Sequence, residues 1–308
     1  MPSVLIYYIS TFLLSLLPVI YSLIPPLHPV LPTSEIVKCV KGKRVRVSDN
    51  DRIEEETNCK LSIIIPAYNE QSRLTTGLTG LLSALSTSPL PLSSFEVILC
   101  NDGSTDSTES CCLNFSNSNN LNLYLLTLSE NCGKGGALKS GFESAIGEYI
   151  LMADADGATD WNELHKFFNI LREDMKGRGA VIGSRAHMEG KVKRSVFRTV
   201  LMKGFHAVVR VFGRTEVKDT QCGFKMFDRE SGKKVFRNVR LLRWSFDVEV
   251  LSLCTVMGVE VKEVGVKWEE VEGSKLGEEG LGWVAVRMLR DVVFMRWAYA
   301  VGIWRVEE

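Results

Sequence analysis

Two carboxylates stand directly after an apolar run of strand type. The run Tyr149–Met152 leads through Ala153 into Asp154, Ala155 and Asp156. Side chains two residues apart on an extended chain project to the same side, so Asp154 and Asp156 point together. Open α/β sheets bind ligands at the carboxyl ends of their strands, and paired hard oxygens suit Mg²⁺ or Mn²⁺ holding a diphosphate. An Asp-x-Asp pair alone is also typical of a solvated acidic turn, so its surroundings must decide.

Three more polar turns follow apolar runs earlier in the chain. They are Pro66–Glu70, Asn101–Asp106 and Asn131–Gly136. Asp, Asn, Ser and Gly are common in ordinary turns and caps, so each turn alone is weak evidence. Four such turns at one edge of a sheet favour a nucleotide-binding cleft.

The glycine-rich turn differs from the phosphate loop of NTPases. Lys134 follows Gly133, but no glycine stands five positions before Gly133, and Gly135 occupies the place of the required hydroxyl residue. An NTPase is therefore disfavoured. The glycines still permit close backbone approach, and Lys134 at a helix N-terminus is suited to face phosphate.

Alternation of short apolar runs with helical segments predicts an α/β fold, a Rossmann-like, mostly parallel sheet with flanking helices. Strands are expected at 61–66, 95–101, 121–127, 148–153 and 179–183, and helices at 71–86, 105–113, 134–146 and 162–173. The Asn/Ser-rich segment 114–122 predicts an exposed loop.

Composition sets limits on partners and compartment. The 308 residues include 37 basic and 37 acidic side chains, so no net field favours nucleic acid. The eight cysteines form no C-x-x-C pair or zinc spacing, which favours reduced packing residues over a disulfide framework. A homo-oligomer is compatible with the sequence.

The N-terminal sequence predicts a membrane anchor. Residues 4–31 contain no Lys, Arg, Asp or Glu, and the apolar part up to Ile24 would form a helix of about 30 Å, which matches a bilayer core. A cleaved signal peptide is the alternative, but no basic n-region or clear cleavage site supports it. Basic residues at 38–46 follow the apolar part and predict that the C-terminal bulk faces the cytosol.

These features divide the chain into four parts. We expect an anchor over 1–31, a polar linker over 32–60, a catalytic domain over 61–240 and a C-terminal acceptor and membrane-interface segment over 241–308.

Two amphipathic helices are predicted in the second half. Spacing over 195–213 fits a helix that either packs on the sheet or lies at a membrane surface. A second helix over 281–304 carries an apolar stripe of Val286, Leu289, Val293, Trp297, Ala300 and Trp304. Its charged residues make a membrane span costly, so an interfacial helix with aromatic anchors is expected.

The ordered motifs carry a family resemblance. Pro-Ala-Tyr-Asn-Glu at 66–70, Asn-Asp-Gly-Ser at 101–104, Asn-Cys-Gly-Lys-Gly-Gly-Ala at 131–137 and Asp-Ala-Asp-Gly-Ala-Thr at 154–159 resemble the inverting family-2 glycosyltransferases of GT-A fold. The runs 183–187, 219–225 and 244–249 are similar to those of dolichyl-phosphate β-glucosyltransferases. Related mannosyltransferases have Leu-Gln where this chain has Gly157-Ala158. That departure favours the glucosyl branch and leaves the third protein ligand of the metal unidentified.

The resemblance implies a donor site and a cofactor. Pro66, Ala67, Tyr68 and Glu70 would line the uridine pocket, and Asp102 would accept a hydrogen bond from the uracil. Asp154 and Asp156 would hold the divalent metal (Mg²⁺ or Mn²⁺) on the diphosphate. Lys134 and Ala155 would also bind the donor nucleotide sugar. Asp219 would be the acidic residue near the donor sugar, so Asp154, Asp156 and Asp219 form the expected catalytic set. A turn aspartate is the alternative for Asp219.

The resemblance also implies an acceptor. Dolichyl phosphate would attack the anomeric carbon of UDP-glucose with inversion, giving dolichyl β-D-glucosyl phosphate for protein N-glycosylation. A phosphate monoester is largely anionic at neutral pH, so no strong general base is needed. Arg185, Arg198 and Lys275 are the expected acceptor-phosphate cations, with plain surface charge as the alternative.

The implied setting is the endoplasmic-reticulum membrane, with a single retained signal-anchor and a cytosolic catalytic domain against the lipid bilayer. A GDP-mannose-dependent transferase of the same fold is the nearest alternative, followed by a non-catalytic nucleotide-sugar-binding membrane protein. The four histidines, at 28, 165, 187 and 206, form no convincing ligand set.

Overall fold

A mixed sheet of nine strands organises the described part of this computed structural model, which covers residues 29–41, 43–46, 58–119, 121–186, 209, 213, 215–271 and 281–307. The strand order is β2-β1-β5-β4-β3-β6-β8-β7-β9. The strands are β1 Ser34–Val40, β2 Lys43–Arg46, β3 Leu61–Ala67, β4 Phe95–Asn101, β5 Leu123–Leu128, β6 Tyr149–Met152, β7 Ala180–Ser184, β8 Lys225–Asp228 and β9 Val261–Gly265.

The centre of the sheet is parallel and its flanks are mixed. Strands β5, β4, β3 and β6 run parallel to one another, whereas β1 pairs antiparallel with β2 and β5, and β8 pairs antiparallel with β6 and β7. The predicted parallel sheet is therefore confirmed for the central strands that carry the polar turns, and the sheet as a whole is mixed.

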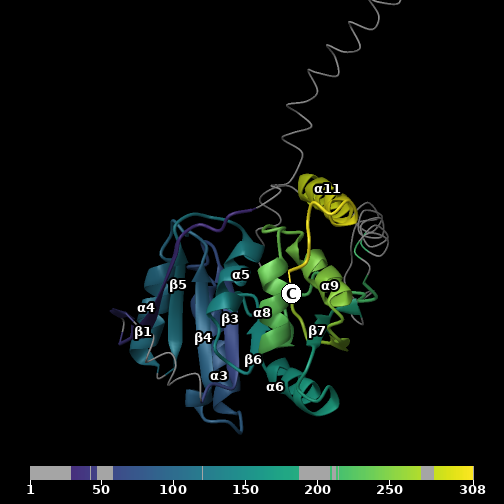
Figure 1. Ribbon diagram of the computed structural model, residues 1–308. Coiled ribbons are helices and arrows are strands. Elements are labelled where there is room, and N and C mark those ends of the chain that lie inside the picture. The colour runs from purple at the N-terminus through teal and green to yellow at the C-terminus, as the bar shows by residue number, and fades with distance from the viewer. Residues whose placement is uncertain are drawn as a thin grey trace, which may run out of the picture.

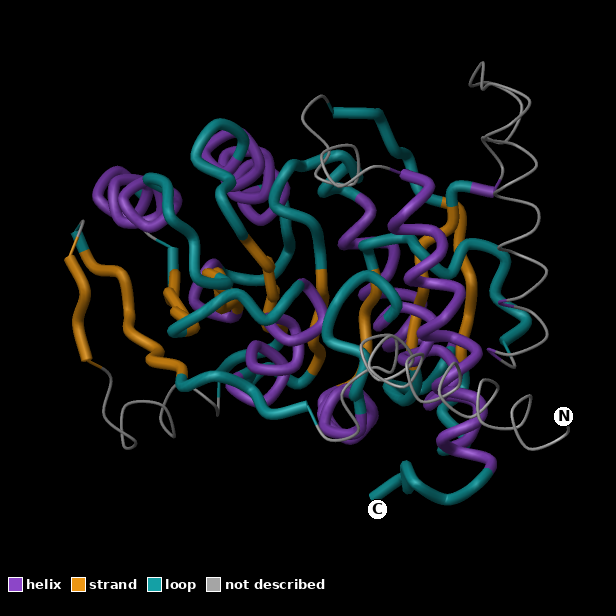
Figure 2. Tube along the Cα trace, turned by 90° about the horizontal axis from the view of Figure 1, so that it is seen from above, coloured by secondary structure: helices purple, strands orange, loops and turns teal. Residues whose placement is uncertain are grey.

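Helices cover both faces of the sheet (Figures 1 and 2). One layer holds α3 Leu74–Ser86, α4 Thr108–Ser118 and α6 Glu163–Asn169, which continues as a π turn over Ile170–Asp174. The other layer holds α5 Lys134–Ser144, α8 Arg229–Asn238 and α9 Phe246–Val256. A short 3₁₀ turn, Leu92–Ser94, precedes β4.

Strand alternation explains why helices are needed on both faces. Along β3, Ile63 and Ile65 pack into the core with α3 and α4, while Ile64 packs into the core with α5. Central strands buried on both faces read as continuous apolar runs, which is the pattern of β3 and β4. The five strands predicted from those runs are confirmed within two residues at each end.

Two segments differ from the sequence prediction. The expected polar linker over 32–60 contains β1 and β2, which add a hairpin to the sheet edge beside β5. Among the β1 residues whose burial is described, Val37 and Cys39 are buried, and Glu35 and Lys38 interrupt the apolar run, which conceals the strand in a hydropathy plot. The expected exposed loop over 114–122 is largely helical, because α4 extends to Ser118 and buries Phe115.

The C-terminal helix α11, Leu281–Ala300, packs beside α9 and ends earlier than predicted. Its inner face buries Val284, Met288, Val292, Met295 and Ala298. The predicted apolar stripe forms the opposite, outward face, except Trp304, which follows the helix and is 1% exposed.

The outward face of α11 is apolar as well. Its exposed large side chains are Trp283, Val286, Leu289, Val293 and Trp297. The helix is thus apolar on two sides, with its charged residues on the flanks. Within the described ranges, no helix combines the length and the apolar character required to span a membrane. The predicted anchor over 1–31 lies outside the described ranges up to residue 28. The predicted helix over 195–213 also lies outside them, except for residues 209 and 213.

Candidate active site

The Asp154–Asp156 turn follows β6 at the centre of the sheet, between β3 and β8. Asp154 Oδ1 lies 2.5 Å from Lys134 Nζ at the start of α5. Asp156 accepts a hydrogen bond from the Ala158 N–H at 3.0 Å, and its other oxygen lies 3.4 Å from Arg73 Nη1. The structure therefore places Lys134 against Asp154, and Arg73 against Asp156.

Two glycines hold this turn by close contact. A Cβ on Gly223 would lie 2.2 Å from Asp154 Oδ2, and a Cβ on Gly77 would lie 2.1 Å from the Ala155 carbonyl oxygen. Both distances are far inside van der Waals contact. Only glycine therefore lets the loop before β8 and helix α3 approach the turn this closely. Neither glycine was singled out from the sequence, because the close approach depends on tertiary structure.

The first two polar turns are hydrogen-bonded to each other. The Asn69 N–H donates to Ser104 Oγ at 3.0 Å, the Thr105 N–H donates to Asn69 Oδ1 at 2.8 Å, and the Glu70 N–H donates to Thr108 Oγ1 at 2.7 Å. Asn69 has a φ of 52°, a left-handed conformation that asparagine tolerates. These bonds fix the turn after β3 against the turn after β4.

Asp102 joins the second turn to the third. Its carboxylate accepts from the Cys132 N–H at 2.8 Å and from the Gly133 N–H at 2.9 Å, and it is 3% exposed. The sequence predicted that four polar turns meet at one edge of the sheet. The hydrogen bonds of Asn69, Glu70 and Asp102 connect three of those turns. The proposed bond from Asp102 to uracil stays a prediction.

The residues predicted to line the uridine pocket differ in exposure. Tyr68 is 37% exposed, so its ring is accessible, whereas Ala67 is buried and would reach a ligand only through its backbone. Glu70 is buried and pairs with Arg73 through two hydrogen bonds of 2.9 and 2.8 Å. Arg73 bridges Glu70 and Asp156 and was missed from the sequence, since nothing in its local motif marks it.

Arg185 and Asp219 form one ion pair. Arg185 Nε donates to Asp219 Oδ2 at 2.7 Å and Nη2 donates to Oδ1 at 2.9 Å, and the guanidinium lies 5.4 Å from the Trp268 ring centroid. Burial favours a higher pKa for Asp219, but Arg185 outweighs burial and holds this pKa below its ordinary value. Asp219 is thus a charged carboxylate engaged by Arg185.

This ion pair predicts a pH dependence of stability. Because the folded-state pKa of Asp219 is depressed, the pair stabilises the fold above the ordinary carboxyl pKa, and this stabilisation is lost as the pH falls through the folded-state value. We expect Asp219→Asn to lower the melting temperature by about 5 °C at pH 7, because losing the charge-assisted hydrogen bonds to Arg185 lowers the free energy of unfolding by about 2 kcal/mol. The difference from wild type should shrink below about pH 4. Calorimetry from pH 7 to 3 checks this, and a difference that grows with acid contradicts it.

A second buried ion pair lies behind Asp154. Lys225 on β8 is fully buried and donates to Asp247 and, at 2.6 Å, to the Cys222 carbonyl oxygen. Burial raises the pKa of Asp247 despite the neighbouring lysines. Asp247 lies inside the 244–249 run that the sequence analysis used only for the family resemblance, so its position beside the site was missed.

The remaining predicted residues lie away from this cluster or outside the described residues. Arg198 and Lys275, the remaining acceptor cations, lie in the undescribed ranges, as do His28, His187 and His206. His165 Nε2 lies 3.0 Å from the Ala84 carbonyl oxygen, in keeping with a packing role.

The donor set fits a divalent cation completed by a nucleotide. Asp154 and Asp156 belong to the same turn, and their carboxylate oxygens are ligands of the kind that Mg²⁺ and Mn²⁺ accept. No group of three His, Cys, Asp or Glu residues that could hold a metal occurs among the described residues. One or two carboxylates plus substrate phosphates is the usual way in which Mg²⁺ is bound.

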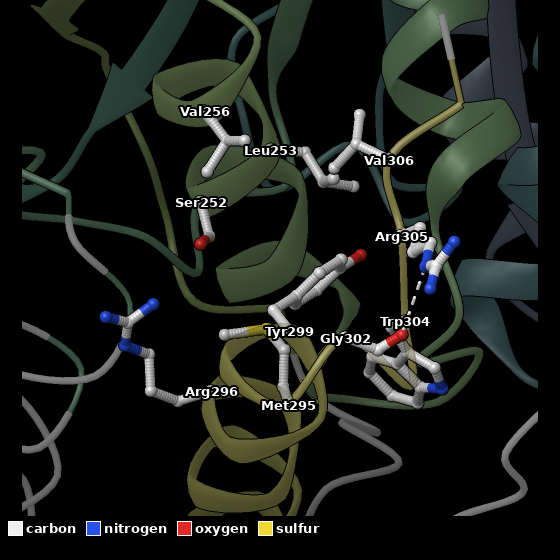
Figure 3. Close-up of a pocket in the computed structure, with 10 residues that line it drawn as sticks. All are labelled: Ser252, Leu253, Val256, Met295, Arg296, Tyr299, Gly302, Trp304, Arg305 and Val306. Carbon is white, nitrogen blue, oxygen red and sulfur yellow. Dashed lines mark hydrogen bonds between the residues drawn. The ribbon is translucent and has the colours of Figure 1, made fainter.

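A separate cavity of about 370 Å³ lies between α9, α11 and residues 302–306 (Figure 3). Apolar side chains such as Leu253, Met295 and Trp304 line it, with Arg296 and Arg305 at its sides. None of its lining residues belongs to the predicted site.

Comparison with known proteins places the chain in a family. The family model Glycosyl transferase family 2 matches residues 62–236. The "Dolichyl-phosphate beta-glucosyltransferase" of Drosophila melanogaster is 42% identical over 263 residues, which cover 82% of this chain and 79% of that protein. The chain belongs to the dolichyl-phosphate beta-glucosyltransferases. Members of this family from Homo sapiens and Saccharomyces cerevisiae are 39% and 38% identical, covering 81% and 82% of this chain and 78% of each relative.

Solved structures show the fold at lower identity. Glucosyl-3-phosphoglycerate synthase from Mycobacterium tuberculosis, in complex with Mn²⁺, UDP and glucosyl-3-phosphoglycerate, matches with a TM-score of 0.51 at 15% identity, over 82% of this chain and 85% of that one. A mannosyltransferase from Pyrobaculum calidifontis, in complex with GDP-Man and Mn²⁺, matches with a TM-score of 0.53 at 18% identity, over 80% and 66% of the two chains. The predicted GT-A glycosyltransferase fold is confirmed.

Proposed function

We propose that this chain transfers glucose from UDP-glucose to dolichyl phosphate, releasing UDP and forming dolichyl β-D-glucosyl phosphate for protein N-glycosylation. The observation that carries the proposal is identity of about 40% to dolichyl-phosphate beta-glucosyltransferases over four-fifths of the chain. The joined polar turns at the end of β6 supply a site of suitable chemistry.

On the donor side, Tyr68 offers an accessible ring for the uracil, while Pro66, Ala67, Glu70 and Asp102 shape the pocket around it. Asp154 and Asp156 would hold a divalent cation, and Ala155 and Lys134 would contribute to binding the diphosphate. When bound, the cation neutralises charge that develops on the departing UDP.

On the acceptor side, positioning of an anionic nucleophile matters more than proton removal. Dolichyl phosphate already carries the attacking oxygen as an anion at neutral pH. Arg185 orients this phosphate together with Arg198 and Lys275, and Asp219 fixes the Arg185 guanidinium. In-line attack from the face opposite UDP inverts the anomeric carbon.

The membrane setting completes the proposal. The outward face of α11 has two exposed tryptophans and three exposed aliphatic side chains, with arginines on its flanks. Such a helix fits the interface of a bilayer. We propose that it lies on the cytosolic surface of the endoplasmic-reticulum membrane, to which residues 1–31 anchor the chain.

Product analysis tests the proposal. Membranes containing the full chain are incubated with dolichyl phosphate and labelled UDP-glucose, with or without excess unlabelled GDP-mannose. We expect a labelled lipid with a β-linked glucosyl phosphate, formed in the same amount whether or not GDP-mannose is present. Transfer from labelled GDP-mannose but not from UDP-glucose would favour the mannosyl alternative, and no transfer from either would favour a binding protein.

Arg198 gives a separate test of the acceptor site. Arg198→Ala should raise the KM for dolichyl phosphate by about tenfold while changing the KM for UDP-glucose little, since one charge-assisted bond is worth about 1.5–3 kcal/mol. Initial rates at varied lipid concentration check this, with Arg172→Ala, on an exposed turn, as the control. An unchanged KM for the lipid would remove Arg198 from the acceptor site.

A further inference from the structure

Asp154, a proposed metal ligand, already holds an internal cation. Lys134 Nζ lies 2.5 Å from Asp154 Oδ1, and the lysine side chain is 21% exposed. Among the described residues, Asp154 is the only carboxylate in ion-pair contact with Lys134. Because the Gly223 backbone packs against Asp154 Oδ2, a divalent cation would bind Asp154 through Oδ1, where the ammonium now lies. Like charges at such range repel strongly in a partly buried site.

The second internal cation is held differently. Arg73 lies 3.4 Å from Asp156, but it also makes two shorter hydrogen bonds to Glu70. Arg73 therefore has an anchor that does not depend on Asp156. Lys134, at the first residue of α5, has a flexible four-carbon stem, and besides Asp154 its ammonium lies 5.9 Å from the Phe246 ring centroid. A ring face holds a cation more weakly than a second carboxylate, so Lys134 is the more easily displaced of the two cations.

The Lys134 ammonium has a second position to occupy within the same site. Helix α5 begins at Lys134, so the positive end of the helix dipole and the lysine side chain lie at one corner of the site, where both favour an anion. A diphosphate in that corner attracts the ammonium away from Asp154.

We propose that Lys134 is an exchangeable counter-ion, which occupies Asp154 until nucleotide diphosphate draws it away and thereby opens Asp154 to the divalent cation. This deepens the proposed function and rests on it. Lys134 weakens metal binding by the chain alone and makes nucleotide and metal binding cooperative beyond the direct metal–phosphate contact. By linkage, the metal must raise nucleotide affinity by the same factor.

Metal binding without turnover tests this inference. Mn²⁺ affinity of the purified full chain is measured by electron paramagnetic resonance for wild type, Lys134→Met and Asp154→Asn, without and with UDP. We expect Lys134→Met to bind Mn²⁺ about tenfold more tightly than wild type without UDP, because the competing charge is gone. The increase in Mn²⁺ affinity on adding UDP should be smaller in that variant than in wild type.

The control and the outcomes separate this inference from the proposed function. Lys234→Met removes one exposed charge from α8 and should leave Mn²⁺ affinity unchanged. Equal or weaker Mn²⁺ binding by Lys134→Met overturns the exchange, even if glucosyl transfer is intact. Unchanged Mn²⁺ binding by Asp154→Asn instead overturns the metal site itself.

Discussion

Asp156→Asn is expected to lower glucosyl transfer by about 1,000-fold or more while the protein stays folded. A metal bound at the proposed site would supply several kcal/mol of stabilisation to the departing diphosphate, and each 1.4 kcal/mol corresponds to about tenfold in rate. An asparagine oxygen still accepts the Ala158 N–H, and Arg73 keeps its bonds to Glu70, so the turn is preserved. Only the charge that binds the cation is lost.

Initial rates with labelled UDP-glucose and thermal melting check this expectation together. The matched control is Asp174→Asn, an exposed aspartate paired with Lys262 far from the polar turns. Transfer within about threefold of wild type by Asp156→Asn would exclude Asp156 as a metal ligand.

Gly223→Ala is expected to cost about 100-fold in transfer rate without changing any polar group. The added Cβ would lie 2.2 Å from Asp154 Oδ2, so either the carboxylate or the loop before β8 must shift by about an ångström. A displacement of that size at a reacting centre costs about 100-fold.

The matched control is Gly282→Ala in α11, where an added Cβ meets no atom within 4 Å. We expect its activity to equal wild type. Unchanged transfer and unchanged Mn²⁺ affinity in Gly223→Ala would show that the position of Asp154 is not held by this contact.

Sequence alone predicted the parts of the fold that repeat a strong pattern. Runs such as 61–66 and 95–101 are buried on both faces, so their composition identifies them as central strands. Strand β1 escaped prediction because Glu35 and Lys38 interrupt its apolar residues. Helix α4 escaped in part because its second half is rich in Asn and Ser, whose local preference the burial of Phe115 overrides.

The residues of the site also divide into those that the sequence predicted and those that it did not. Asp154, Asp156, Asp102 and Lys134 lie in motifs that follow strands, so topology alone brings them together. Arg73, Gly77 and Gly223 act through contacts between distant elements, which a single sequence does not reveal. The pairing of Arg185 with Asp219 joined two residues that had been assigned to different substrates.

The central claim is that two carboxylates after β6 bind a divalent cation against the diphosphate of UDP-glucose. Its most direct test is glucosyl transfer by the purified full chain after chelation and dialysis, before and after Mn²⁺ or Mg²⁺ is restored. The account predicts that transfer disappears with the metal and returns when either effective ion is added. Undiminished transfer by the metal-depleted protein would contradict it.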